Sequence, residues 1–136
     1  FIYLKRGDKL AEAVSYLRAE QTGLWHQYAD GSDMERLEPS QRDGFAAAAI
    51  TERIHMLNGF DANWEKWFDQ TGLAPLRLGY EDLARDPQAH VAQVLTYIGQ
   101  DPARATDLNP PLKKLADDVS ADWITTYNTL FPSWRQ

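Results

Sequence analysis

Two side chains near the start of the sequence have the chemistry to hold a small anion. Arg6 follows the apolar run FIYL, and Ser15 lies further on in a pattern typical of a helix. A guanidinium donates several charge-assisted hydrogen bonds and a hydroxyl donates a single short one, so the pair suits a clamp on one phosphate group. Lys5 and Lys9 add positive charge nearby. The alternative is a surface arginine and a serine that faces solvent.

The elements around this pair place it at the edge of a sheet. Residues 1–4 are continuously apolar, which predicts a strand buried on both faces. Asp8 is a suitable N-cap for a helix that runs to residue 22 and stops at Gly23. Ligands of open parallel sheets bind beyond the carboxyl ends of the strands, near helix N-termini. We therefore expect Arg6 at such an edge.

The rest of the chain reads as mostly helical. In chain order, the patterns predict a loop at 23–39, a helical region at 40–70, a second strand at 73–80, a helix at 87–99, an irregular segment and a last helix capped by Ser120. The first helix has a core stripe of Leu10, Ala13, Val14 and Leu17, and the helix at 87–99 has one of Val91, Val94, Leu95 and Ile98. Gly59 is expected to kink or break the long helix.

Two strands, each followed by a helix, indicate an α/β fold with an incomplete parallel sheet, since two strands do not build such a sheet alone. The simplest hypothesis is that residues 1–136 are the C-terminal part of a single α/β domain whose earlier strands are missing. The alternative is that the partner strands come from another subunit.

Composition limits the class of protein. The chain has 136 residues with 43% hydrophobic and 25% charged side chains, as in ordinary globular proteins. Its net charge of −6 argues against a nucleic-acid binder, which usually has a basic surface. No apolar run reaches the roughly 20 residues that span a bilayer, and cysteine is absent. We expect a cytoplasmic protein with no membrane span and no metal.

Two stretches resemble those of a known family. FIYLKRGDKLAEAVSYLRAEQTGLWH resembles the 3′-phosphate-binding segment of sulfotransferases, in particular the bacterial group of trehalose and lipopolysaccharide sulfotransferases. The matching positions are Arg6, Asp8, Ser15, Thr22, Gly23 and Trp25. LRLGYEDLARDPQAHVAQVLTYIG resembles the strand-plus-helix "YEDL..DP" segment of the same family, and the end of the chain is similar to its closing segment.

The resemblance implies a P-loop-like sulfotransferase fold and the donor 3′-phosphoadenosine-5′-phosphosulfate. It implies that Arg6 and Ser15 hold the 3′-phosphate of this donor, and that Tyr80 lies near the adenine. It also implies that Lys113 and Lys114 approach the nucleotide. The acceptor is then a hydroxyl of a carbohydrate or glycolipid. A homodimer is compatible with the resemblance, because members of the family often dimerise.

The sequence also departs from the family. It has no strand–loop–helix rich in Ser, Thr and Gly for the 5′-phosphosulfate, and the family's catalytic base lies upstream of the matching segment. We therefore assign no catalytic residue and expect that the N-terminal donor-loop portion is absent. The chain alone is then expected to bind the 3′ end of the donor without transferring the sulfuryl group.

Other candidates have less specific patterns. Trp25 and His26 are candidates for acceptor binding, against the alternative of a surface histidine. Trp64, Trp67 and Phe68 share one helix face, which indicates core more often than a sugar platform or a dimer contact.

A second class of function is a non-catalytic helical interaction module, or a degenerate sulfotransferase relative, that uses the tryptophan-rich face. A third class, a kinase of the P-loop type, lacks support because the sequence has no G-x-x-x-x-G-K-[ST] loop.

Overall fold

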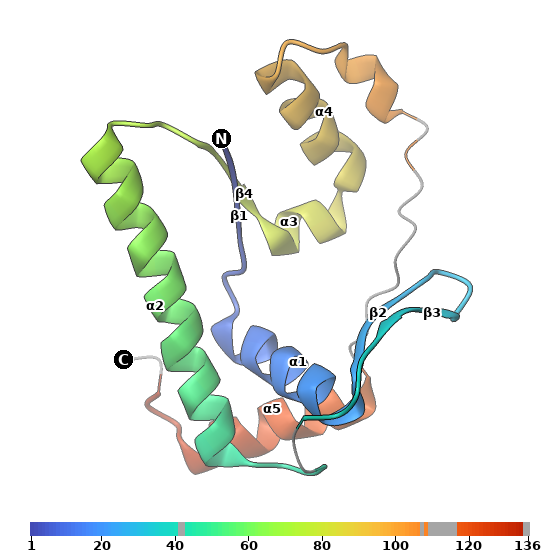
Figure 1. Ribbon diagram of the computed structural model, residues 1–136, viewed down its shortest axis with the longest axis vertical. Coiled ribbons are helices and arrows are strands. Elements are labelled where there is room, and N and C mark those ends of the chain that lie inside the picture. Colours follow the sequence, from blue (N-terminus) through green and yellow to red (C-terminus); the bar gives the residue numbers. More distant parts are fainter. Residues whose placement is uncertain (41–42, 107, 109–116, 135–136) are drawn as a thin grey trace. The chain divides into compact units, whose positions relative to one another are not determined.

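The computed structural model describes residues 1–40, 43–106, 108 and 117–134. These residues form two units, to which we give names. The sheet unit comprises Phe1–Gly7 and Gly59–Pro110, and the helical unit comprises Asp8–Asn58 and Pro111–Gln136. The chain combines helices and strands and includes one small parallel sheet, consistent with the α/β class (Figure 1).

The sheet unit is built on two parallel strands, β1 (Ile2–Lys5) and β4 (Leu76–Gly79). Three helical elements follow β4 along the chain: α3 (Tyr80–Arg85), α4 (Pro87–Tyr97) and the 3-10 helix η1 (Pro102–Ala105). Asp86 caps α4, because its carboxylate accepts a hydrogen bond from the backbone N–H of Ala89 at 3.0 Å. Both predicted strands and the predicted helix at 87–99 are thus confirmed, whereas η1 lies in a segment that was predicted to be irregular.

The expected burial of the first strand on both faces is wrong. Tyr3 is buried and packs against Phe68, with ring centroids 5.4 Å apart, whereas Ile2 and Leu4 on the opposite face remain 46% and 47% exposed. The helix at 87–99 likewise turns Ile98 outward, and Ile98 is 53% exposed. A continuous apolar run predicts burial on both faces only where both faces are covered, and in the described part of the chain β1 pairs with a single strand.

The helical unit begins with α1 (Lys9–Thr22), which has the predicted bounds. The Asp8 carboxylate caps it by accepting a hydrogen bond from the Ala11 N–H, and Gly23 ends it with a left-handed φ of 72°. A Cβ on Gly23 would lie 1.9 Å from the Leu37 carbonyl oxygen, so only glycine fits there. The predicted core stripe is confirmed, since all four of its residues are buried: Leu10, Ala13, Val14 and Leu17.

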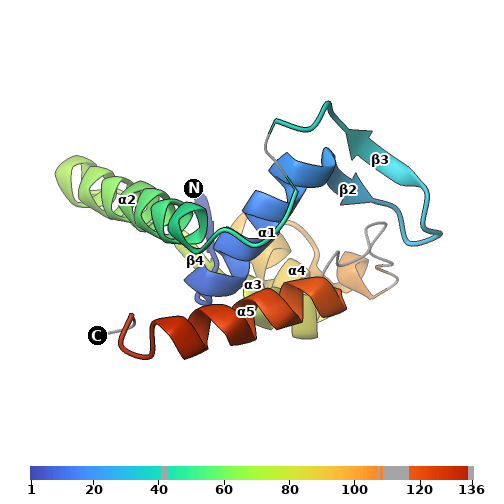
Figure 2. The same cartoon turned by 90° about the horizontal axis from the view of Figure 1, so that it is seen from below.

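The segment predicted as a loop instead forms a hairpin of β2 (Leu24–Gln27) and β3 (Asp33–Arg36). Asp30-Gly31 reads as a turn in the sequence, but the two short strands that it joins were not predicted. Asp30 supports this turn, because its carboxylate accepts hydrogen bonds from the backbone N–H and the hydroxyl of Ser32. Figure 2 shows the hairpin beyond the end of α1.

Helix α2 (Ala47–Thr71) runs without a break through Gly59, contrary to the expected interruption. Its first part completes the core of the helical unit with Ile50, Ile54 and Leu57. Its last turns belong to the sheet unit, where Phe68 is buried and Trp64 is 49% exposed. The predicted core face is therefore confirmed for Phe68 and wrong for Trp64.

Helix α5 (Asp118–Leu130) contributes Trp123 and Tyr127 to the core of the helical unit. Its N-cap is Asp117 rather than Ser120, because the Asp117 carboxylate accepts hydrogen bonds from the Ser120 N–H at 2.8 Å and from its hydroxyl at 2.7 Å. Within the described residues, no helix combines the length and the apolar character needed to cross a membrane.

Candidate functional site

The parallel pairing of β1 and β4 brings two sequence-predicted residues together. The register pairs Lys5 with Gly79, so the next residue of each chain segment, Arg6 and Tyr80, leaves the sheet at the same edge. Just beyond them, the Gly7 N–H donates a hydrogen bond of 3.1 Å to the Glu81 carboxylate. This is the carboxyl edge of a parallel sheet, where α/β proteins bind their ligands.

Arg6 and Tyr80 are in direct contact. The central guanidinium carbon of Arg6 lies 4.3 Å from the centroid of the Tyr80 ring, within the range of a cation–π interaction. Both side chains are half-buried. The Arg6 Nε is enclosed and has no hydrogen-bond partner among the described residues. A half-buried guanidinium that forms no ion pair can donate charge-assisted hydrogen bonds to an anion.

Lys5 and Lys9, the cations nearest to Arg6 in the sequence, each form an ion pair with a carboxylate. Lys5 Nζ lies 3.5 Å from an Asp61 carboxylate oxygen, and Lys9 Nζ lies 2.7 Å from a Glu12 oxygen. No described residue forms an ion pair with Arg6. Of the three cations predicted near the start of the chain, Arg6 therefore has the charge that is least neutralised.

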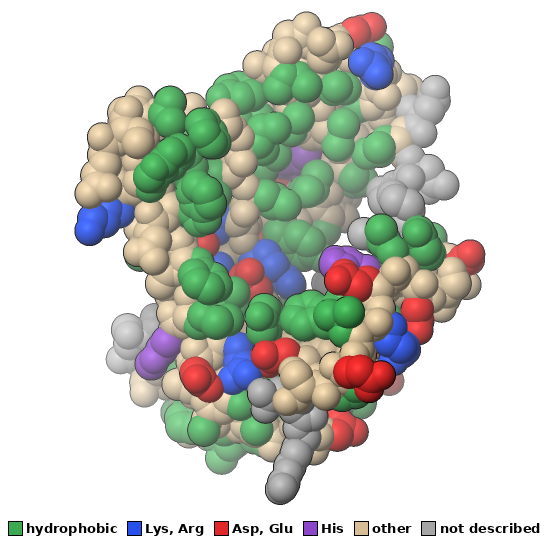
Figure 3. Space-filling view, in the orientation of Figure 1, with side chains coloured by type: hydrophobic (Ala, Val, Ile, Leu, Met, Phe, Trp, Pro, Cys, Tyr) green, Lys and Arg blue, Asp and Glu red, His purple; other side chains and the backbone are tan. Residues whose placement is uncertain are grey.

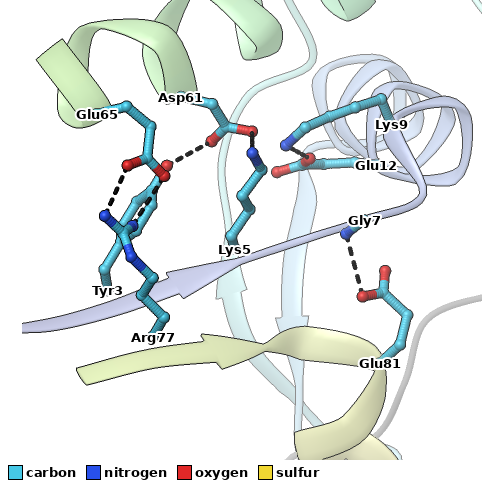
Figure 4. A network of polar contacts seen from close by, with 9 residues as sticks. All are labelled: Tyr3, Lys5, Gly7, Lys9, Glu12, Asp61, Glu65, Arg77 and Glu81. Atoms are coloured by element: carbon cyan, nitrogen blue, oxygen red, sulfur yellow. Dashed lines mark hydrogen bonds and ion pairs between the residues drawn. The ribbon is translucent and has the colours of Figure 1, made fainter. Parts of the chain in front are cut away.

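Asp61 also joins Lys5 to the interior of the sheet unit (Figure 4). The Tyr3 hydroxyl donates a hydrogen bond of 3.0 Å to Asp61. Burial, followed by this hydrogen bond, raises the pKa of Tyr3 to about 12. Beside it, Arg77 pairs with Glu65 at 2.8 Å. The network stabilises the side of β1 that faces α2, and it leaves Arg6 out.

A cavity of about 380 Å³ opens beside this network. It is lined by Tyr3, Lys5, Gly7, Glu65, Arg77, Leu78, Gly79, Glu81 and Asp82. Three carboxylates outnumber the two cations there, so the cavity is a poor place for a phosphate. Arg6 and Tyr80 do not line it, which separates this cavity from the candidate anion site.

Ser15 lies exposed on α1 in the helical unit. Its hydroxyl is therefore accessible, as a phosphate contact requires. Arg6 belongs to the sheet unit, and the joint action of the two side chains on one phosphate stays a prediction. Lys113 and Lys114 lie outside the described residues.

The two predicted acceptor-binding residues lie on the hairpin strand β2. Trp25 is half-buried, with its ring edge-on to Tyr16 at a centroid distance of 5.4 Å. His26 is exposed, and its Nδ1 lies 2.6 Å from a Glu35 carboxylate oxygen. Glu35 was missed as a neighbour because the hairpin was missed. Reading the Asp30-Gly31 turn as the turn of a hairpin would have placed Glu35 near His26.

Among the residues that the structure describes, no three side chains of the His, Cys, Asp or Glu type gather closely enough to hold a metal ion. The three histidines lie on different elements: His26 on β2, His55 on α2 and His90 on α4.

An arginine at the end of a parallel strand and a following helix with an accessible serine are features of the sulfotransferases discussed above. The Stf0 sulphotransferase family model matches residues 1–129, and the chain belongs to this family. The resemblance to bacterial sulfotransferases of the trehalose 2-sulfotransferase type, which the sequence motifs indicated, is thereby confirmed at the level of the family.

Two relatives are described as trehalose 2-sulfotransferases. That of Mycobacterium tuberculosis is 34% identical over 135 residues, which cover 97% of this chain and 46% of the relative. That of Mycolicibacterium smegmatis is 33% identical over 126 residues, covering 93% of this chain and 44% of the relative. The chain thus spans about half the length of the curated relatives that it matches.

Proposed function

We propose that this chain supplies the part of a sulfotransferase that binds the 3′-phosphate of 3′-phosphoadenosine-5′-phosphosulfate. The observation that carries the proposal is the state of Arg6: a half-buried cation at the carboxyl edge of β1, with no ion pair to any described residue. A guanidinium in that state fits a phosphate oxygen. Membership of the Stf0 family supports the choice of a sulfuryl donor.

In this proposal the parallel pair β1–β4 is part of a P-loop-like sulfotransferase sheet, and residues 1–136 are the C-terminal part of its domain. The donor supplies the sulfuryl group, and the residues of this chain bind and orient the donor's 3′ end. Arg6 acts by charge and Ser15 by a single hydrogen bond. Catalysis by the complete protein then rests on positioning and on stabilising the charge that develops on the bridging oxygen.

The acceptor in this proposal is a hydroxyl of a carbohydrate or glycolipid. Trp25 offers an apolar ring and His26 a polar one on β2, which is a pairing suited to a sugar. The names of the two relatives, trehalose 2-sulfotransferases, support a carbohydrate as the acceptor class.

The test compares two nucleotides on the complete protein by calorimetry. Adenosine 3′,5′-bisphosphate should bind far better than adenosine 5′-monophosphate. Arg6→Ala should remove most of this preference, at a cost of about 1.5–3 kcal/mol, because a charge-assisted hydrogen bond is lost. Arg104→Ala is the matched control, because it removes the same charge from an exposed position on η1. Equal binding of the two nucleotides by the unchanged protein would overturn the assignment.

One observation favours a second candidate function, a non-catalytic interaction module. Phe60 and Trp64 are 54% and 49% exposed on the later part of α2, where Figure 3 shows hydrophobic side chains gathered on the surface. An apolar patch of this kind suits a protein partner. This function predicts no affinity for either nucleotide, so the same calorimetric experiment separates the two.

A further inference from the structure

Two interactions, one before and one after it in the chain, hold the contact between Arg6 and Tyr80 in place. Before the contact, the register of the sheet pairs Lys5 with Gly79. After it, the hydrogen bond from the Gly7 N–H to Glu81 joins the same two chain segments again (Figure 4). Arg6 and Tyr80 are therefore held next to each other by the strand register on one side and by a hydrogen bond to the Glu81 side chain on the other.

This arrangement limits what the Tyr80 ring can do. The guanidinium lies 4.3 Å from the ring centroid and so covers one face of the ring. A nucleobase needs an open face for stacking, and the covered face is not available to it.

We propose that Tyr80 is a positioning residue: the ring face that the Arg6 guanidinium covers holds this guanidinium for the 3′-phosphate and does not stack on the adenine. This inference rests on the proposed function and differs from the adenine contact that the family resemblance implies. An arginine loses rotamer freedom when it binds an anion, and a side chain held in advance by an aromatic face loses less. Tyr80 thus raises affinity for the 3′-phosphate without touching it.

The experiment uses Tyr80→Phe, which keeps the ring, and Tyr80→Leu, which removes it. The readout is the ratio of affinities for adenosine 3′,5′-bisphosphate and adenosine 5′-monophosphate. Tyr80→Leu should lower this ratio by about three- to tenfold, the range of a partly desolvated cation–π contact. It should leave the affinity for the monophosphate unchanged, and Tyr80→Phe should preserve the ratio.

An adenine contact gives a different result, because both nucleotides contain adenine. Equal losses of the two affinities in Tyr80→Leu overturn the inference, as does an unchanged ratio. Tyr97→Leu is the matched control, since Tyr97 is 45% exposed on α4 of the same unit. If Tyr80→Leu fails to fold by circular dichroism, Tyr80→Met supplies similar apolar bulk without a ring.

A second measurement separates this inference from the proposed function. The Arg6 Nε–H group is enclosed, so its NMR signal should be protected from exchange with water. Protection should persist in Tyr80→Phe and fall at least tenfold in Tyr80→Leu, with no nucleotide present. Unchanged protection in Tyr80→Leu overturns the positioning role. Absence of a 3′-phosphate preference in the unchanged protein overturns the proposed function instead.

Discussion

The helical unit has the larger buried core, whereas the sheet unit encloses few large apolar side chains. The four largest fully buried side chains all lie in the helical unit: Leu10, Val14, Leu17 and Ile50. In the sheet unit, Ile2, Leu4 and Trp64 are each close to half exposed. This contrast teaches that stability and ligand chemistry are unevenly divided, because the sheet unit carries Arg6, a half-buried cation that forms no ion pair with a described residue.

The largest expected effect tests this contrast in stability. Leu17→Ala should lower the free energy of unfolding by about 2–5 kcal/mol, because it opens a cavity among side chains that are almost fully enclosed. Leu4→Ala removes the same atoms from β1, where Leu4 is 47% exposed, and should cost less than about 1 kcal/mol. Urea denaturation measures both. Equal losses would contradict the division between the two units.

The second prediction concerns the pH dependence of stability. A residue of the sheet unit should lose its contribution in alkaline solution, and a residue of the helical unit should lose its contribution in acid solution. The pKa of Tyr3 in the sheet unit is raised to about 12, first by burial and then by its hydrogen bond to Asp61. The folded state therefore favours the neutral phenol. Its contribution to stability is complete below the ordinary pKa of about 10 and is lost as the pH rises from there to about 12.

The difference in stability between the unchanged protein and Tyr3→Phe should consequently shrink by about 1–2 kcal/mol over that range, because phenylalanine has no proton to lose. In the helical unit, burial acts to raise the pKa of Asp117, but hydrogen bonds from Ser120 and the charge of Arg18 outweigh it and lower the pKa. The contribution of Asp117 is present above about pH 4 and falls in more acid solution.

The measurement is chemical denaturation across both pH ranges, with Asp117→Asn as the acid counterpart of Tyr3→Phe. Tyr3→Phe should reduce the dependence of the free energy of unfolding on pH in the alkaline range only. Asp117→Asn should reduce it in the acid range only. A Tyr3→Phe variant that loses stability between pH 10 and 12 in parallel with the unchanged protein would show that Tyr3 does not titrate there.

The sequence predicted elements well where local signals agree with packing. The Asp8 cap, the stripe that includes Leu17 and the stop at Gly23 define α1 without help from the rest of the chain. The hairpin was missed because β2 and β3 have four residues each and little hydrophobic alternation, so the turn Asp30-Gly31 was their main signal.

Burial was predicted less well than secondary structure. Sequence patterns show which face of an element is apolar, but they do not show what covers that face, as Ile2 and Trp64 demonstrate. For the site, Arg6 was found from its position after a strand. Its contact with Tyr80 depends on the register of two strands far apart in the sequence, which no local pattern encodes.

The smallest expected effect tests whether Arg6 of the sheet unit and Ser15 of the helical unit bind the same phosphate. Ser15→Ala should weaken binding of adenosine 3′,5′-bisphosphate by about 1 kcal/mol, roughly fivefold, since one hydrogen bond from a neutral hydroxyl is lost. Ser15 is exposed and alanine favours helix, so the fold should not suffer. Thr125→Ala on α5 removes another exposed hydroxyl and serves as the control.

The decisive comparison is the double variant with Arg6→Ala. If both side chains bind the same phosphate, loss of Arg6 lets that group shift, and Ser15→Ala then costs measurably less than it does alone. Strict additivity of the two losses would mean that Arg6 and Ser15 act on different groups. In that case the sheet unit alone would account for recognition of the 3′-phosphate, and the contrast between the units would be sharper than the sequence predicts.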